Sequence, residues 1–95
     1  MQTLRNIRSE NQMPEITRFY GIAVKIYFNR EHNPPHFHAI YGDKEGIFEI
    51  KTLTMLHGDL PVKAQALVKE WAVRYQNELL EMWNTKQVQK LNPLD

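Results

Sequence analysis

Residues 22–28, with the sequence Ile-Ala-Val-Lys-Ile-Tyr-Phe, decide the fold of this chain. Large apolar side chains alternate along this stretch with smaller or polar ones. The apolar positions are Ile22, Val24, Ile26 and Phe28. An alternation with a period of two is typical of a β-strand that buries one of its faces. A register slip of one residue would turn these side chains to water, so the pattern also fixes which residues lie on the other face.

Further strands are predicted on the C-terminal side of this stretch. Residues 36–41 place Phe37, Ala39 and Tyr41 on one face, and residues 47–51 place Phe48 and Ile50 on one face. Between them, residues 42–46 (Gly-Asp-Lys-Glu-Gly) have the composition of a turn. Residues 52–57 are expected to form a short fourth strand or an irregular connection. Three or four antiparallel strands therefore follow one another along the chain.

Residues 61–86 are predicted to form one long helix, with Pro61 tolerated in its first turn and Asp59 available to cap it. Its apolar residues follow helical spacing and form one broad face. They are Ala64, Leu67, Val68, Trp71, Tyr75, Leu79, Met82 and Trp83. The expected fold class is α+β: an antiparallel sheet of three to four strands with one long C-terminal helix packed on its apolar face.

Composition limits the class of protein. The 95 residues, 42% hydrophobic and 24% charged, predict a single globular domain over residues 13–95, preceded by a polar arm at residues 1–12. A net charge of +1 gives no overall attraction to nucleic acid or membranes, and the absence of cysteine excludes disulfides, thiolate zinc sites and a cysteine nucleophile. No apolar run approaches the roughly 20 residues of a membrane span. We therefore expect a cytoplasmic protein without membrane contact.

The face of the sheet that points away from the helix is expected to be polar. By the same alternation it carries Lys25, Tyr27, His36, His38, Glu49 and Lys51. The register between the second and third strands is less constrained, because a shift of two residues preserves the alternation. A two-residue loop at Asp43-Lys44 would place His38 opposite Glu49, whereas a four-residue loop would place His38 opposite Lys51. Both registers predict a cluster of ionisable groups.

Histidines are concentrated in residues 32–38 (His-Asn-Pro-Pro-His-Phe-His), which hold three of the four in the chain. Imidazole titrates near neutral pH, binds transition metals and transfers protons. Pro34 and Pro35 restrict the backbone directly before His36 and His38, and these two histidines leave a strand on the same face. The fourth histidine, His57, is interpreted as a surface turn residue.

Three kinds of function fit these residues. The first is a metal-independent ribonuclease, in which histidines transfer protons and cations stabilise the phosphate. Its catalytic residues would be His36, His38, Tyr27 and Glu49, with Glu49 orienting an imidazole. Its phosphate contacts would be Lys25, Arg30 and Lys51. The same cations and aromatic rings could also bind RNA or DNA without chemistry.

The second function is a metal site. His32, His36 and His38 would supply three nitrogen ligands for zinc or another transition metal, with Glu49 as an oxygen ligand or orienter. The ribonuclease interpretation needs no cofactor. The third function is a protein-interaction module or homodimer, suggested by the aromatic residues Trp71, Trp83, Tyr20 and Tyr75.

Several motifs together resemble a bacterial family catalogued as domain of unknown function 4160. The first half of the resemblance comprises residues 13–22 (Met-Pro-Glu-Ile-Thr-Arg-Phe-Tyr-Gly-Ile), 26–29 (Ile-Tyr-Phe-Asn) and 32–42, which contain the proline–histidine motif. Residues 58–61 (Gly-Asp-Leu-Pro), 70–72 (Glu-Trp-Ala) and 78–83 (Glu-Leu-Leu-Glu-Met-Trp) are similar to its C-terminal half. The resemblance covers about residues 13–94.

This resemblance implies a small cytoplasmic protein encoded beside another small domain, in a two-gene module such as a toxin–antitoxin pair. It supplies no catalytic residues to carry over. The leading hypothesis is therefore a component of such a module that engages RNA or DNA through its histidine-rich sheet face. Its expected partners are nucleic acid, the protein encoded next to it, or a second copy of itself.

Overall fold

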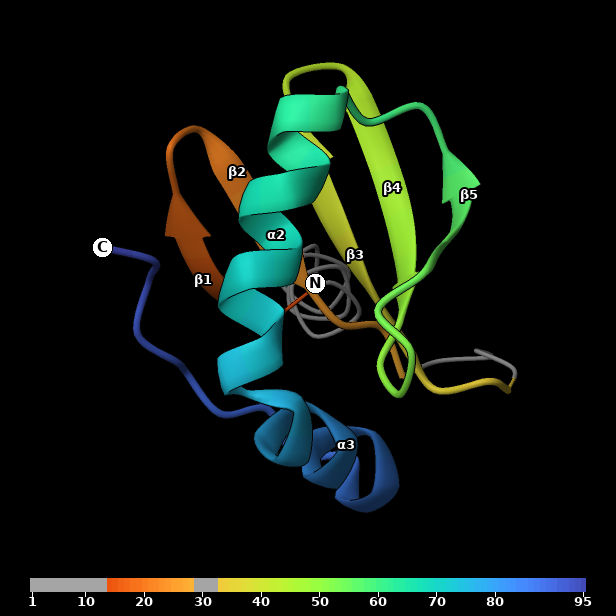
Figure 1. Ribbon diagram of the computed structural model, residues 1–95. Helices are drawn as coiled ribbons and strands as arrows, with labels where there is room; N and C mark the ends of the chain where they lie inside the picture. The colour runs from red at the N-terminus through yellow and green to blue at the C-terminus, as the bar shows by residue number, and fades with distance from the viewer. Residues whose placement is uncertain (1–13, 29–32) are drawn as a thin grey trace, which may run out of the picture.

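A computed structural model describes residues 14–28 and 33–95 of the chain. It consists of one five-stranded antiparallel sheet followed by two helices (Figure 1). The strands are β1 (Glu15–Phe19), β2 (Ile22–Lys25), β3 (His36–Tyr41), β4 (Lys44–Glu49) and β5 (Met55–Gly58). The helices are α2 (Val62–Arg74) and α3 (Gln76–Thr85). The predicted polar arm at residues 1–12 lies outside the described residues.

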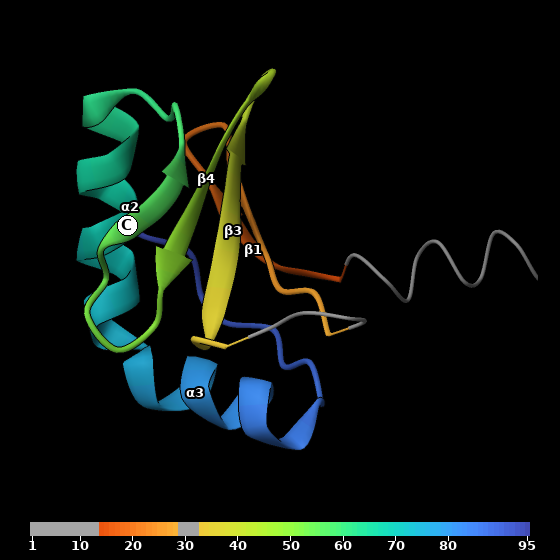
Figure 2. The same ribbon diagram turned by 90° about the vertical axis from the view of Figure 1, so that its right-hand side faces the viewer.

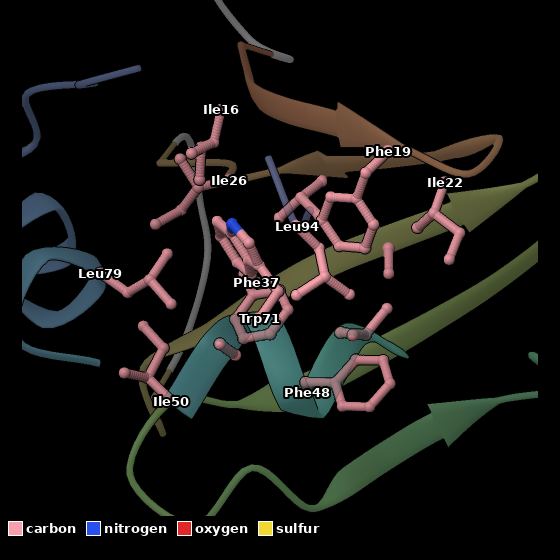
Figure 3. Close-up of a cluster of buried hydrophobic side chains, with 14 of the residues drawn as sticks. Ile16, Phe19, Ile22, Ile26, Phe37, Phe48, Ile50, Trp71, Leu79 and Leu94 are labelled. Carbon is pink, nitrogen blue, oxygen red and sulfur yellow. The ribbon is translucent and has the colours of Figure 1, made fainter. Parts of the chain in front are cut away.

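The sheet and the helices form two layers. Helix α2 covers one face of the sheet and α3 lies beneath one end of it, while no described helix covers the opposite face (Figure 2). The core lies between the sheet and the helices, with Trp71 of α2 packed among side chains from several strands (Figure 3). Most of the predicted apolar sheet face is buried there: Ile22, Val24, Ile26, Phe37, Ala39, Phe48 and Ile50. Phe28 packs partly against the core, but Tyr41 is 42% exposed.

The sheet has more strands than predicted because the chain turns tightly at Tyr20-Gly21. These residues have φ angles of 50° and 78°, and Phe19 pairs with Ile22 across them. Two consecutive positive φ angles in a two-residue loop are typical of a type I′ hairpin turn. Residues 15–19 thereby form an additional strand, and β2 ends at Lys25 rather than continuing to Phe28. The predicted α+β class is confirmed, but the strand count was too low.

The register between β3 and β4 also differs from both predicted registers. The turn consists of Gly42-Asp43, so that Tyr41 pairs with Lys44, His38 with Ile47 and His36 with Glu49. Strand β4 therefore begins three residues earlier than expected. The register expected for a two-residue loop differs from the observed one by two residues. A shift of two residues leaves every side chain on the same face, so the predicted faces were still correct. Residues 55–58 pair with β4 as the short additional strand that was one of two expectations.

The predicted long helix is two helices. The break is at Tyr75, which has φ −125° and donates its backbone N–H to the Ala72 carbonyl. The adjacent Gln76 side chain donates to the carbonyls of Ile50 and Lys51, which ties the break to the end of β4. No proline or glycine marks this position, so the break depends on tertiary contacts. It turns α3 beneath the sheet and buries Leu79, Met82 and Trp83 there.

Residues 87–95 run back along β1 as an extended segment, hereafter the C-terminal segment. The backbone N–H of Leu91 donates to the Ile16 carbonyl at 3.2 Å, and the Trp71 indole N–H donates to the Asn92 carbonyl at 2.8 Å. Leu94 is 7% exposed and belongs to the core. This segment therefore covers the β1 edge of the sheet and completes the core.

Leu94 provides a test of that contribution. Replacing Leu94 with alanine is expected to lower the free energy of unfolding by about 2 kcal/mol, at the low end for a buried leucine because the site borders solvent. Val88, in the same segment, is 37% exposed, and Val88→Ala is expected to change stability by less than about 0.5 kcal/mol. Urea denaturation of both variants measures the difference. Equal losses of stability in Leu94→Ala and Val88→Ala would show that burial of the Leu94 side chain does not hold the segment in place.

On the β1 edge, the Arg18 guanidinium donates to the Glu15 carboxylate at 2.8 and 3.1 Å. This hydrogen-bonded pair holds the pKa of Glu15 below its ordinary value.

Within the described residues, no helix is both long enough and apolar enough to cross a membrane.

Candidate functional site

The outer face of the sheet, which points away from α2, carries both ionisable and apolar side chains. Antiparallel partners share a face, so the register assigns these residues to it: Glu15, Arg18, Ala23, Lys25, His36, His38, Ile40, Glu45, Ile47, Glu49 and His57. Ala23 and His38 are buried, and Ile40 and Ile47 are half-buried. The face is therefore less polar than predicted, with His38 in its centre.

His38 is held by a carboxylate. Its Nδ1 lies 2.7 Å from Oε2 of Glu45, and only 7% of the residue is exposed. Because an ionised carboxylate only accepts hydrogen bonds, Nδ1 of His38 is the donor in this contact. The ring of Tyr27 lies against the imidazole, with a centroid separation of 4.1 Å. His38 is thus fixed in both position and tautomer.

His36 lies next to His38 and is fixed in a similar way. Its Nδ1 donates to the Pro34 carbonyl at 2.7 Å, and its ring centroid is 5.5 Å from that of His38. On its other side the ring contacts Trp83 of α3 at 4.9 Å. The Pro35 carbonyl accepts the Ile50 N–H at 3.0 Å. The carbonyls of Pro34 and Pro35 therefore both accept hydrogen bonds next to the start of β3.

Glu49 was predicted to orient a histidine. Among the described residues, no hydrogen bond joins its carboxylate to His36 or His38. It pairs across the ladder with His36, and its Oε1 accepts the Thr52 hydroxyl at 3.0 Å. Neither of the two expected cross-strand partners of His38, Glu49 and Lys51, is correct, because the turn at Gly42-Asp43 pairs His38 with Ile47. The carboxylate that contacts His38 comes from Glu45 instead.

The three cationic residues predicted to contact phosphate do not lie together. Lys25 pairs with His38 across the β2–β3 ladder, which puts the two residues side by side. Lys51 lies beyond the end of β4 in an exposed turn and faces no β3 residue. Arg30 lies outside the described residues. The structure therefore brings one of the three predicted cations to the centre of the outer face.

The predicted metal site is only partly described, because His32 lies outside the described residues. Within residues 14–28 and 33–95, no group of three histidine, aspartate or glutamate side chains is arranged to hold one metal ion. The Nδ1 atoms of His36 and His38 already contact Pro34 and Glu45. These two Nδ1 atoms could bind a metal only if those contacts were broken.

Three residues near this site were not predicted from the sequence. Glu45 was assigned to a turn, although Gly-Asp is itself a hairpin dipeptide that would have placed Glu45 on the outer face. Trp83 was assigned to the core only, and Lys86 was given no role. The Lys86 ammonium lies 4.7 Å from the Trp83 ring centroid and 5.8 Å from that of Phe28, as a cation–π contact. His57 is a strand residue paired with Ile47, and not a turn residue.

Comparison with known proteins agrees with the sequence motifs. The family model "Domain of unknown function (DUF4160)" matches residues 21–84, which is more than half of the chain. The chain belongs to this family. No curated protein and no solved structure matches it significantly.

The DUF4160 match includes the whole of the histidine site. His36, His38, Glu45 and Trp83 all lie within the matched residues, from β3, β4 and α3. Strand β1 and the C-terminal segment both lie outside the match. The family model therefore does not cover the hydrogen bond that joins them, from the Leu91 N–H to the Ile16 carbonyl. The match is shorter than the resemblance over residues 13–94 that the motifs indicated.

Proposed function

We propose that this DUF4160 protein engages RNA through the outer face of its sheet and cleaves it without a metal ion. The observation that carries the proposal is the 2.7 Å contact between His38 Nδ1 and Glu45 Oε2. A carboxylate behind an imidazole fixes its tautomer and stabilises the imidazolium that forms when the other nitrogen accepts a proton. This arrangement suits a general base.

The neighbouring side chains would supply the remaining parts of such a reaction. His38 would take the proton of a 2′-hydroxyl at Nε2, and the hydroxyl oxygen would attack the adjacent phosphorus. His36 would return a proton to the departing 5′ oxygen, leaving a 2′,3′-cyclic phosphate and a 5′-hydroxyl. Lys25 would stabilise the charge that develops on the phosphate. RNA is favoured over DNA because this chemistry requires the 2′-hydroxyl.

The two histidines differ in how far they are exposed to solvent. His38 is 7% exposed and His36 is half-buried, so His36 is the more accessible imidazole. The first measurement is the binding of single-stranded RNA at several salt concentrations. Phosphate contacts make the affinity fall as the salt concentration rises. Cleavage is measured second, in the presence of a chelator.

The matched pair Glu45→Gln and Glu49→Gln tests the proposed mechanism. Both residues lie on the same face of β4, but only Glu45 contacts His38. We expect His38→Ala to lower the cleavage rate by about 10²–10⁴-fold, Glu45→Gln to lower it by at least about tenfold, and Glu49→Gln to leave it unchanged. Cyclic-phosphate ends on the products would identify the chemistry.

Three results would count against the proposal. Absence of both binding and cleavage at low salt would remove it altogether. Salt-dependent binding without cleavage would reduce it to a binding module. Equal cleavage of RNA and of DNA would exclude the 2′-hydroxyl as nucleophile.

We further propose that the protein acts as one component of a two-gene module of toxin–antitoxin type, as the family resemblance suggests. The corresponding experiment expresses the full chain with and without the neighbouring gene product and follows growth and RNA integrity. Growth arrest relieved by the neighbour would support this role. Normal growth in both cases, with intact RNA, would contradict it.

A further inference from the structure

Lys86 directly follows α3 and lies on the same side of the sheet as His36 and His38, hereafter the histidine pair. Helix α3 begins at the end of α2 and runs beneath the sheet, so its last residues lie on the side of the outer face (Figure 2). The Lys86 ammonium is 4.7 Å from the centroid of the Trp83 ring, and that ring is 4.9 Å from the ring of His36. One aromatic side chain therefore connects this ammonium to the histidine pair.

The segment around Lys86 carries positive charge only. Residues 82–94 contain two lysines and no aspartate or glutamate, and residues 84–90 are all exposed. The Lys86 ammonium lies beside the uncharged rings of Trp83 and Phe28. Its charge is therefore presented to solvent in a locally basic segment. Exposed segments of this kind attract phosphate groups.

No carboxylate of the outer face is paired with Lys86. Glu45 and Glu49 belong to β4, and Glu15 belongs to β1. Among the described residues, no aspartate or glutamate oxygen lies within ion-pair distance of the Lys86 ammonium. The Glu15 carboxylate is instead hydrogen-bonded to Arg18. A phosphate beside Lys86 would therefore meet its positive charge without displacing a carboxylate.

The backbone of Lys86 adopts a conformation that favours glycine. Lys86 ends α3 with φ 61° and ψ 31°, and its N–H donates to the Met82 carbonyl at 2.8 Å. The left-handed residue at the end of a helix is most often glycine and sometimes asparagine, because a Cβ is unfavourable there. A lysine stands at this position although glycine would end the helix at least as well. Residues held in this region despite their side chain cluster at functional sites.

The order of the side chains gives the direction of a bound strand. In the proposed reaction His38 takes the proton of the 2′-hydroxyl, which belongs to the nucleotide on the 5′ side of the cleaved bond. His36 protonates the departing 5′ oxygen, which belongs to the nucleotide on the 3′ side. The His36 ring contacts both His38 and Trp83, at 5.5 and 4.9 Å between centroids. The nucleotide on the 3′ side would therefore lie toward Trp83 and Lys86.

We propose that Lys86 binds the phosphate that follows this 3′ nucleotide, so that the RNA strand leaves the histidine pair toward the end of α3. The inference rests on the proposed function, because the direction follows from the roles of His36 and His38. Lys86 would take no part in proton transfer, since Trp83 lies between it and the histidine pair. Its contribution is to the binding and direction of the strand.

Two dinucleotides of equal charge test the direction. Both are uridine–adenosine dinucleotides in which a 2′-deoxyuridine prevents cleavage, and the additional phosphate is on the 3′ end of one and on the 5′ end of the other. Each is titrated into the full chain at low salt while backbone amide resonances are followed by NMR. We expect the 3′-phosphorylated compound to bind about two- to fivefold more tightly. Equal binding of the two compounds, or tighter binding of the 5′-phosphorylated one, would overturn the proposal.

Matched lysine variants identify the contributing side chain. Lys86→Gln should abolish the preference for the 3′-phosphorylated compound, and Lys86→Arg should retain it. Lys69→Gln, at an exposed lysine of α2, should leave the preference unchanged. Lys86→Gly should also abolish the preference, at an unchanged or higher melting temperature, because glycine suits the left-handed backbone. A loss of binding that follows a loss of thermal stability, or an equal effect of Lys69→Gln, would overturn the proposal.

The salt dependence of a longer single-stranded RNA separates this inference from the proposed function. Each phosphate contact contributes about 0.7 to the slope of log K against log salt for a single strand. Lys86→Gln should therefore reduce the slope by about 0.7, whereas Lys69→Gln should not change it. RNA binding with the same slope in Lys86→Gln as in the unchanged protein would overturn this inference alone. Absence of RNA binding by the unchanged protein would overturn the proposed function and this inference together.

Discussion

Replacing Trp71 with alanine is expected to lower the free energy of unfolding by about 3–5 kcal/mol. Trp71 is fully buried and contacts the rings of Phe19 and Phe37 (Figure 3). It also contacts the ring of Tyr75, and its indole N–H donates to the Asn92 carbonyl. Its removal would leave a cavity and an unpaired carbonyl, and would release the C-terminal segment from α2. For a domain of this length, whose total stability is about 5–15 kcal/mol, this is a large fraction.

Calorimetry provides the measurement, with an expected fall in melting temperature of at least about 12 °C. Val73→Ala is the control on the same helix, because Val73 is 60% exposed and its truncation should shift stability by less than about 0.5 kcal/mol. Trp71→Phe should fall between the two, since it keeps an aromatic ring but loses the hydrogen bond. A loss below about 1 kcal/mol for Trp71→Ala would mean that the core closes around the cavity.

Gly58→Ala is expected to cost about 2–5 kcal/mol, which is unusual for the addition of one methyl group. Gly58 has φ 116°, and an added Cβ would lie 2.1 Å from the Glu45 carbonyl oxygen and 2.8 Å from the Gly46 Cα. Both atoms belong to the backbone, so no side-chain rotation relieves the clash. Strand β5 would have to move away from β4, which also breaks the bond from the Asp59 N–H to the Glu45 carbonyl.

Gly42→Ala is the matched control for this substitution. Gly42 also has a positive φ, of 62°, but nothing lies within 4 Å of an added Cβ. The expected cost is therefore about 1 kcal/mol, for backbone strain alone. Urea denaturation of both variants separates strain from collision. Equal losses at the two positions would show that β5 can move without consequence for the sheet.

The alternation of apolar residues predicted the sheet well, because burial of one face is a strong constraint on every strand. It placed Phe37 and Phe48 in the core and His36 and His38 on the opposite face, as the structure confirms. The register could not be predicted in the same way, since a shift of two residues preserves burial. The choice depends on the local turn, and Gly42 begins that turn one residue before the assumed position.

The uncertainty in strand register also explains which contacts of the candidate site were predicted correctly and which were not. Tyr27, His36 and His38 come together as expected, because their faces follow from alternation. Glu45 replaces Glu49 as the partner of His38, because the choice of carboxylate depends on register. The contact of Trp83 with His36 could not be foreseen, since it requires the break at Tyr75 that turns α3 beneath the sheet. That break has no local signal in the sequence.

The strand order β1-β2-β3-β4-β5 has a consequence for the rate of folding. Each strand pairs with its neighbour in the sequence, so the contacts that build the sheet close short loops. Proteins with such local contacts fold faster than β-proteins with distant pairings. The C-terminal segment is the exception, since Tyr20 and Asp95 meet across 75 residues. We therefore expect the sheet to assemble early, with the C-terminal segment docking as the last event and detaching first during unfolding.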